Sequence, residues 1–471
     1  MHNLYEAVIG LEVHAELATR SKIFCSCPTT FGAAPNTACC PNCMGFPGTL
    51  PVLNRNALIL GIKAGLATGC QISREVRFHR KHYLYPDLPK AYQITQYDTP
   101  LCTGGSLPIT VSAGERIVGI TRIHLEEDAG KLIHTESQGT LVDHNRCGIP
   151  LIEVVTEPEL HSSEEAVAFL KTLRSRLLFA GVSDCKMQEG SLRCDVNLSI
   201  RKKGDTALGV RTEMKNLNSF SSVKRAIDAE FLRQVQMIEN GEEIFRETRR
   251  FDEITGETIL LRRKETTSDY RFLPEPDLPP FRLEEELITS LADTLPEMPE
   301  AKKQRYQSLY GVTDEECDLL LSEPFLAALF EHSASQTLYP KLLVNLLLGD
   351  LLTKLSGASA DPLALASVAT LWGDGRVNST AAKRLAMLVA EGETDPISAM
   401  ERLDLAQNSD PGAIRGWIEG VLEKDPSLLD SYRRGKTNVV KAISGAVMAA
   451  SRGKANPVLL AKLLEERLAK I

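Results

Sequence analysis

VIGLEVHAEL (residues 8–17) alternates apolar and polar side chains, with the period of two that is typical of a half-buried β-strand. The same alternation recurs in SLPITV (106–111), RIVGITRIHLEED (116–128) and LRCDVNLSIR (192–201). Turns that contain glycine or proline, such as AGER and YPDLP, separate these stretches. We therefore expect mainly antiparallel strands in the first part of the chain.

Two stretches within this part have a helical pattern instead. They are SSEEAVAFLKTLRSRLLFAG (162–181), for which we expect an N-cap at Ser163, and NSFSSVKRAIDAEFLRQVQMIENG (218–241). Each begins near a serine and ends at a glycine, as helices often do. Helices mixed with mainly antiparallel strands predict an α+β fold.

Beyond the proline-rich segment FLPEPDLPPF (272–281) the alternation stops, and apolar residues recur at helical spacing. The chain has 471 residues, which is too long for one ordinary domain. We expect a sheet-containing domain over residues 1–292, a helical domain over 293–405 and a tail domain over 406–471.

The composition excludes two classes of protein. Lysine and arginine number 54 against 62 aspartate and glutamate residues, and a net charge of −8 does not fit a generally basic nucleic-acid binder. No apolar run approaches the roughly 20 residues that span a bilayer. The first residues also lack the pattern of a secretory signal, which is a basic segment followed by an apolar one. We expect a cytoplasmic protein that makes no membrane contact.

One segment near the end departs from this acidic composition. Residues 432–457 contain no acidic residue and six basic ones, Arg433, Arg434, Lys436, Lys441, Arg452 and Lys454. A strictly basic segment in an acidic protein favours binding of a polyanion, and we expect nucleic acid to bind here. The alternative is a packed terminal helix with charged ends.

Five of the 11 cysteines lie between residues 25 and 43. Cys25 and Cys27 form one close pair and Cys40 and Cys43 a second, so four thiolates could enclose a tetrahedral Zn²⁺ ion. Cys39 could compete with Cys40, and the alternative is a set of free thiols in a loop rich in glycine and proline. A zinc ion with four sulfur ligands would be structural, because it has no open position for chemistry.

Carboxylates and an imidazole recur on the predicted strands. Glu12 and His14 lie two residues apart, so their side chains share one face. Glu153 sits in the apolar run PLIEVV, where an ionised carboxylate needs a cation or a shifted pKa. The strand ITRIHL is followed by Glu126, Glu127 and Asp128. Such ligands suit Mg²⁺ or Mn²⁺, although ordinary charged strand ends would give the same pattern.

Cations interleaved with aromatic residues occupy RFHRKHYLYP (77–86), which includes Lys81. This arrangement suits contacts with phosphate or a nucleotide, and so does KNLNS (215–219) with Lys215 and Asn216. A solvated strand would resemble the first stretch, and a simple helix cap would resemble the second.

Longer motifs extend over nearly the whole chain: YEAVIGLEVHAEL, RKHYLYPDLPKAYQI, GITRIHLEEDAGK, VDHNRCGIPLIEVVTEP, GSLRCDVNLS, KNLNSF, ETRRFD and RGKANP. Together they resemble the B subunit of the tRNA-dependent amidotransferases. The resemblance implies a first domain with the glutamine synthetase and guanido kinase fold, followed by all-α helical and tail domains. It also implies ATP-dependent phosphorylation, and then amidation, of the side-chain carboxylate of Glu-tRNA(Gln), Asp-tRNA(Asn) or both.

The same resemblance implies partners and cofactors. An amidase partner, the A subunit of such enzymes, would release ammonia from glutamine, and a small C subunit would complete a heterotrimer that binds the misacylated tRNA. ATP and Mg²⁺ would take part in the reaction. Structural Zn²⁺ occurs in part of the family, and all four of its cysteines, Cys25, Cys27, Cys40 and Cys43, are present here.

Site residues carry over only where this sequence matches the family motifs. The implied Mg²⁺ ligands are Glu12, His14, Glu127 and Glu153, and the neighbouring carboxylates Glu126 and Asp128 are available to a second ion. We expect Glu127 and Glu153 to be catalytic, and on chemical grounds we nominate Lys81 and Arg146 as further catalytic residues, whose positive charge would stabilise the phosphates. The expected nucleotide contacts are Lys81, Arg146, Lys215 and Asn216.

Two other functions fit parts of the sequence. A non-catalytic scaffold that binds tRNA would need the basic segment, but it has no need of Glu12, His14, Glu127 and Glu153 together. A zinc-dependent RNA-processing enzyme would need an open metal position, which four cysteine ligands do not leave.

Overall fold

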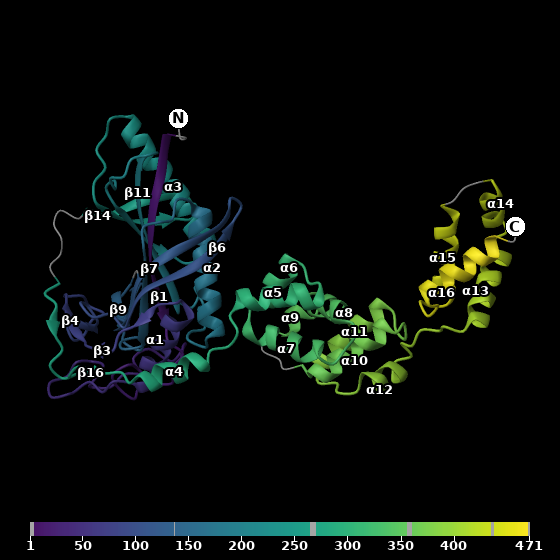
Figure 1. Ribbon diagram of the computed structural model, residues 1–471, viewed down its shortest axis with the longest axis horizontal. Coiled ribbons are helices and arrows are strands. Elements are labelled where there is room, and N and C mark those ends of the chain that lie inside the picture. The colour runs from purple at the N-terminus through teal and green to yellow at the C-terminus, as the bar shows by residue number, and fades with distance from the viewer. Residues whose placement is uncertain (1–3, 136, 264–269, 356–359, 435–437, 470–471) are drawn as a thin grey trace. The chain divides into compact units, whose positions relative to one another are not determined.

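The computed structural model of the protein describes residues 4–135, 137–263, 270–355, 360–434 and 438–469. The chain forms two compact units, Met1–Pro299 and Glu300–Ile471 (Figure 1). The first unit contains the sheet and the second is helical, which confirms the predicted α+β fold. The predicted boundaries near residues 292 and 405 stay predictions.

The strands and the first helices belong to the first unit. Its elements are β1 (Tyr5–Glu16), α1 (Arg55–Ala67), β2 (Gln71–Ile72), β3 (Glu75–Val76), β4 (His79–His82), β5 (Tyr92–Thr95), β6 (Cys102–Val111), β7 (Gly114–Glu127), β8 (Lys131–Thr135), β9 (Gly139–Asp143), β10 (Pro150–Thr156), α2 (Ser163–Phe179), β11 (Leu192–Lys202), β12 (Thr212–Leu217), α3 (Phe220–Glu239), β13 (Glu247–Asp252), β14 (Glu257–Arg263), β15 (Leu273–Pro274), β16 (Phe281–Arg282) and α4 (Glu285–Asp293).

Twelve strands form one sheet, in which β1 lies at the centre between β10 and β11. The order is β14-β13-β12-β11-β1-β10-β7-β5-β4-β15, and β6, which also pairs with β2, is joined to β7. Most neighbours are antiparallel, as the alternating sequences predicted, but β12 and β13 run parallel. A parallel pair needs a crossover connection, and α3 provides it.

The two faces of the sheet differ sharply in polarity. On β1 the side chains of Ile9, Leu11 and Val13 are at most 1% exposed and belong to the main hydrophobic core. Helices α1, α2 and α3 pack on this face (Figure 1). Because side chains alternate along a strand, the intervening residues Glu12 and His14 lie on the opposite, polar face.

Serine side chains start the two long helices. Ser162 Oγ accepts a hydrogen bond from Glu165 N, so the N-cap of α2 is one residue earlier than the predicted Ser163. Ser219 caps α3 in the same way, with Ser222 N as the donor.

The second unit consists of short helices. They are α5 (Pro299–Tyr310, whose first residue belongs to the first unit), α6 (Asp314–Leu320), α7 (Pro324–Ala334), α8 (Pro340–Leu347), α9 (Leu352–Leu355), α10 (Pro362–Gly373), α11 (Ser379–Ala390), α12 (Pro396–Arg402), α13 (Pro411–Lys424), α14 (Ser427–Arg433), α15 (Val439–Ala450) and α16 (Pro457–Leu468). The last helices have a hydrophobic core of their own, which includes Ile418 of α13, Val447 of α15 and Leu464 of α16. Among the described residues, no helix is long and apolar enough to cross a membrane.

Candidate active site and cysteine cluster

Five adjacent strands bring ionisable side chains together on the polar face of the sheet. Strand pairing places His14 of β1 opposite Glu153 of β10, and Glu153 opposite His124 of β7. On the other side of β1, Glu12 lies opposite Asp195 of β11. The register of the sheet thus collects these groups from distant parts of the sequence.

The first group consists of His14, Glu126 and Glu153, whose ligand atoms all lie within 4.8 Å of one another. His14 Nε2 is 3.3 Å from a carboxylate oxygen of Glu126 and 3.3 Å from one of Glu153. His124 Nε2 lies 3.7 Å and 3.6 Å from the same two carboxylates. Nδ1 of His124 is buried and has no hydrogen-bond partner among the described residues.

This first group attracts positive charge. Burial opposes protonation of His14, but the hydrogen bonds and charges of Glu126 and Glu153 outweigh it and raise the His14 pKa to about 10. Burial likewise opposes ionisation of Glu153, yet His124 and His14 hold its pKa at about 2. The buried carboxylate of Glu126, the half-buried carboxylate of Glu153 and an imidazole are also suitable ligands for Mg²⁺ or Mn²⁺, so the donor set fits a divalent cation.

The second group consists of Glu12, Asp195 and Glu213, again with ligand atoms within 4.8 Å of one another. Burial, followed by the charges of Glu153, Asp195 and Glu213, raises the pKa of Glu12. Lys215 Nζ forms ion pairs with Asp195 and, at 3.2 Å, with Glu213. One ammonium group does not balance the charge of three carboxylates, so this group can also bind a cation. Oxygen ligands of this kind suit a divalent cation such as Mg²⁺.

Glu127 does not join either group, contrary to the expectation that it shares an ion with His14 and Glu153. Its side chain is paired with Lys90 Nζ, and it also accepts a hydrogen bond of 2.9 Å from Ile94 N. The reason is the alternation along β7, because Glu127 follows Glu126 directly and therefore points to the opposite face. Glu12, expected in the same site, belongs instead to the second group.

Asp128 and Arg146 form a separate ion pair at the edge of the polar face. Arg146 Nε lies 3.4 Å from Asp128 Oδ2, and Arg193 of β11 donates to the same oxygen at 2.7 Å. Arg146 also donates to the backbone oxygens of residues 129 and 130, at 3.0 and 2.7 Å. Burial and the charge of Asp128 raise the pKa of the neighbouring Glu16 to about 8. Asp128 is therefore already paired with two guanidinium groups.

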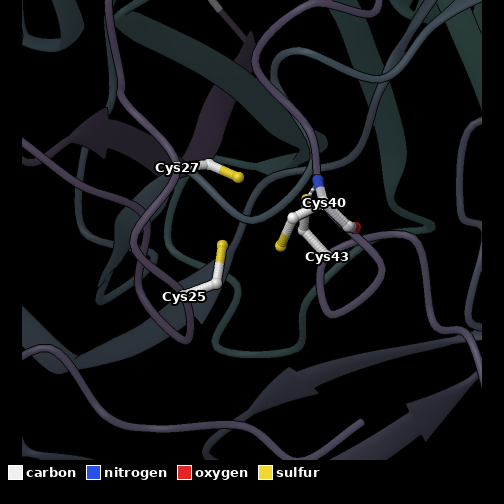
Figure 2. A group of neighbouring side chains, drawn as sticks. All are labelled: Cys25, Cys27, Cys40 and Cys43. Atoms are coloured by element: carbon white, nitrogen blue, oxygen red, sulfur yellow. Dashed lines mark hydrogen bonds between the residues drawn. The ribbon is translucent and has the colours of Figure 1, made fainter.

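The four expected cysteines come together from two segments (Figure 2). Their sulfur atoms lie within 4.8 Å of one another, as a tetrahedral metal site requires. The hydrogen bond with Cys25, assisted by the Cys40 N–H group and the charge of Lys22, lowers the pKa of Cys43 to about 4. Cys39 is not part of the group, because its thiol donates to the backbone oxygen of Asn36 at 3.3 Å.

Comparison with known proteins identifies the family of this chain. The B subunit of the aspartyl/glutamyl-tRNA(Asn/Gln) amidotransferase of Caldicellulosiruptor saccharolyticus is 47% identical over 478 residues, which cover 99% of this chain and 100% of the relative. The chain belongs to the amidotransferase B-subunit family. The family model described as the GatB/GatE catalytic domain matches residues 7–289, and the model described as the GatB domain matches residues 328–468.

Further members of the amidotransferase B-subunit family are similar over the same length. The relative from Caldanaerobacter subterraneus is 45% identical over 99% of this chain and 100% of its own, and that from Lachnoclostridium phytofermentans is 44% identical over 99% of each chain. The family resemblance deduced from the sequence motifs is thus confirmed.

Lys81, Lys215 and Asn216 are the remaining expected contacts of the amidotransferase site. Thr95 of β5 lies opposite Glu126, which is on the polar face. Gln93, two residues earlier on β5, therefore points to the same face, and Lys81 of β4 lies opposite Gln93. The register thus places Lys81 on the polar face. Its Nζ is 5.0 Å from the ring centre of Tyr270 and, within the part of the chain that the structure describes, it forms no ion pair. Asn216 is exposed and has a positive φ of 63°, which asparagine tolerates well.

Some basic side chains in residues 432–457 of this amidotransferase chain are paired with carboxylates in the structure, which the sequence does not reveal. Lys454 pairs with Asp404, and Arg433 lies 3.6 Å from Asp430, so carboxylates outside the segment offset part of its charge. Lys441 and Arg452 are exposed and form no ion pair with any described residue. Lys436 lies outside the described residues, and Arg434 donates to the backbone oxygen of Asp430.

Sequence reasoning did not single out Asp195, Glu213 and Arg193, which the structure brings to the candidate site. A signal for two of them was present, because Asp195 and Arg193 alternate with apolar residues in LRCDVNLSIR and so belong to one polar face. Which strand lies beside β11 could not be deduced from this pattern, and Glu213 offered no comparable signal.

Proposed function

We propose that this chain catalyses the ATP-dependent amidation of the side-chain carboxylate of Glu-tRNA(Gln), Asp-tRNA(Asn) or both. The observation that carries the proposal is the pair of acidic groups on one sheet face, His14 with Glu126 and Glu153, and Glu12 with Asp195 and Glu213. A scaffold that only binds tRNA has no need of two partly buried sets of cation ligands. The names and the full-length similarity of the relatives support the same function.

The chemistry requires an activated carboxylate. The γ-phosphoryl group of ATP bonds to one carboxylate oxygen of the aminoacyl side chain, and ADP leaves. Ammonia then forms a bond to the carboxyl carbon while the bond to the phosphate oxygen breaks, which gives the amide and inorganic phosphate. Divalent cations bound by the two groups would offset the charge of the phosphates during transfer.

The chain's own residues would position these reactants. Lys81 lies on the polar face and, unlike Arg146 and Lys215, forms no ion pair with a described residue, so it is free to bind a phosphate oxygen. Lys215 is held between Asp195 and Glu213 and would orient their carboxylates. Arg146, together with Arg193, would fix the turn at Asp128. Glu127 would act indirectly, by holding Lys90 on the opposite face.

The partners and the location follow from the proposed reaction. The chain would work with an amidase partner that supplies ammonia (the A subunit) and with the small C subunit, and it would bind misacylated tRNA through the C-terminal basic segment. Because the reaction consumes ATP and charged tRNA, we place it in the cytoplasm.

An activity assay tests the proposed function. We expect the complex of this chain with its amidase partner to convert misacylated tRNA to the amide with ATP and Mg²⁺, using either glutamine or ammonium chloride as the nitrogen source. ADP should form in proportion to amide. Testing Glu-tRNA(Gln) and Asp-tRNA(Asn) separately would identify the substrate. Amidation with ammonium chloride that proceeds equally well without ATP would contradict the proposed reaction.

The cysteine cluster would hold a structural Zn²⁺ ion, since four sulfur ligands fill its coordination sphere. We expect the purified full-length chain to contain about one zinc per molecule and the Cys43→Ser variant to retain little of it, with a lower melting temperature. The Cys39→Ser variant is the matched control, because the Cys39 thiol bonds to Asn36 instead of facing the cluster, and it should keep its zinc. Metal analysis by mass spectrometry measures both. Wild-type protein that is folded and free of zinc would contradict the assignment.

A further inference from the structure

The side chain of Lys22 lies beside the cysteine cluster and is 0% exposed. Its Nζ donates to Cys43 Sγ at 3.5 Å and to the backbone oxygen of His144 at 3.4 Å. No carboxylate of the described residues forms an ion pair with it. A buried ammonium group without a carboxylate partner is strongly unfavourable unless another negative charge faces it.

The cysteine cluster can supply this negative charge. Four thiolates around one Zn²⁺ ion carry two net negative charges, so a single ammonium group would balance half of them. The Cys43 sulfur also accepts a hydrogen bond of 3.2 Å from Cys40 N, and it therefore faces two donors. Donors around the ligands of a metal stabilise the charge on those ligands and strengthen metal binding.

The second acceptor of Lys22 belongs to the loop that carries Arg146. His144 O, which accepts from Lys22, lies two residues before Arg146, whose guanidinium group fixes the turn at Asp128. The cysteine loop is joined to the same region by Asn36, whose Nδ2 donates to the Val142 oxygen at 3.0 Å. Lys22 is thus the charged link in a contact between the cluster and this loop.

We propose that Lys22 is a positioning residue that provides the counter-charge of the metal-loaded cysteine cluster and ties the cluster to residues 143–149. This inference rests on the proposed zinc site. It gives Lys22 a role in metal retention that is separate from the chemistry on the polar face of the sheet.

Zinc affinity of the full-length chain tests the inference. We expect Lys22→Met to raise the dissociation constant for zinc by about 10- to 100-fold, as removal of contacts outside the ligand shell typically does. Lys22→Arg should retain most of the affinity, because it keeps the positive charge. The control is Lys63→Met, which removes a half-buried lysine of α1, an element that contributes no cysteine to the cluster. Competition with a chromophoric chelator measures the constants, and far-UV circular dichroism checks the fold.

Melting temperatures with and without zinc separate a charge effect from a general packing effect. We expect Lys22→Met to lower the melting temperature of the zinc-loaded chain more than that of the chelator-treated chain. If Lys22→Met does not fold, Lys22→Gln replaces it in the affinity measurement. A rise of about tenfold or more in the dissociation constant supports the role, and any smaller change in the folded variant overturns it. Zinc-free wild-type protein would instead disprove the underlying metal assignment.

Discussion

Replacing Glu126 by glutamine is expected to lower the rate of ATP-dependent amidation by about 10²- to 10³-fold, the usual cost of losing a group that stabilises charge in a transition state. Glu126 is 3% exposed and lies 3.3 Å from His14, in the middle of the first acidic group. Glutamine keeps the size of the side chain but removes the charge that a divalent cation needs. Single-turnover measurements with saturating ATP and misacylated tRNA would give this rate.

The matched control is Glu115→Gln, the same substitution at an exposed residue of the same strand, β7. We expect this variant to retain full activity. Binding of tRNA, measured separately, should be unchanged in both variants, because Glu126 does not belong to the basic segment. A Glu126→Gln enzyme with normal turnover would favour the scaffold function over catalysis by this chain.

The Mg²⁺ dependence distinguishes Glu126 from its neighbour Glu127. Loss of a ligand should raise the Mg²⁺ concentration for half-maximal rate in Glu126→Gln. In Glu127→Gln this concentration should stay the same, whereas the melting temperature should fall, because Lys90 loses its buried counter-charge. The opposite result would restore Glu127 as a metal ligand, as the family resemblance implied.

The strands of the sheet and the faces of their residues could be predicted from the sequence, because they depend on local alternation. Glu12 and His14 lie on the polar face as expected. Strict alternation along RIVGITRIHLEED would already have placed Glu127 and Glu126 on opposite faces. Glu127 alternates with the buried residues Ile123 and Leu125 and therefore shares their face. The structure thus places Glu127 apart from the two acidic groups, and its role as an ion ligand, which the family motif implied, stays a prediction.

Strand order could not be predicted, because it depends on pairing between residues far apart in the chain. Asp195 lies opposite Glu12, and Glu213 joins the same group from β12. No local pattern indicates that these strands are neighbours. The cysteine cluster is the contrary case, since all four cysteines lie between residues 25 and 43 and their spacing alone predicted the group.

The positive charge of residues 432–457 was also overestimated from the sequence, because it too depends on contacts with residues outside the segment. The carboxylate of Asp404, which pairs with Lys454, lies outside the segment and is brought to it only by folding. Counting charges along the chain therefore gives an upper limit to the positive charge that a ligand meets. Lys441 and Arg452, which are exposed and form no ion pair with a described residue, are the better candidates for phosphate contacts.

Combined replacement of Lys441 and Arg452 by alanine should weaken tRNA binding by roughly 25- to 60-fold at 0.1 M salt, if the affinity at 1 M salt is unchanged. Each phosphate contact contributes about 0.7 to 0.9 to the slope of log affinity against log salt concentration, so two lost contacts should make the slope shallower by about 1.4 to 1.8. Fluorescence anisotropy with labelled tRNA over a salt series measures both quantities. The Michaelis constant for misacylated tRNA should rise in parallel.

Point substitutions test the segment better than a deletion after residue 430. A deletion would remove α15 and α16, whose residues Val447 and Leu464 complete the hydrophobic core with Ile418 of α13. The exposed apolar surface would destabilise the remaining helices, so any loss of binding could reflect unfolding. Lys441→Ala and Arg452→Ala remove exposed charges and leave this core intact.

Lys454→Ala is the matched control, because Asp404 already offsets the charge of Lys454. We expect this variant to change the salt slope far less than the loss of Lys441 or Arg452 does. Glutamine hydrolysis by the amidase partner in the absence of tRNA should be the same in all variants. If the double variant binds tRNA with undiminished affinity and the same salt slope, the segment is a packed terminal helix with charged ends, and tRNA must bind elsewhere on the chain.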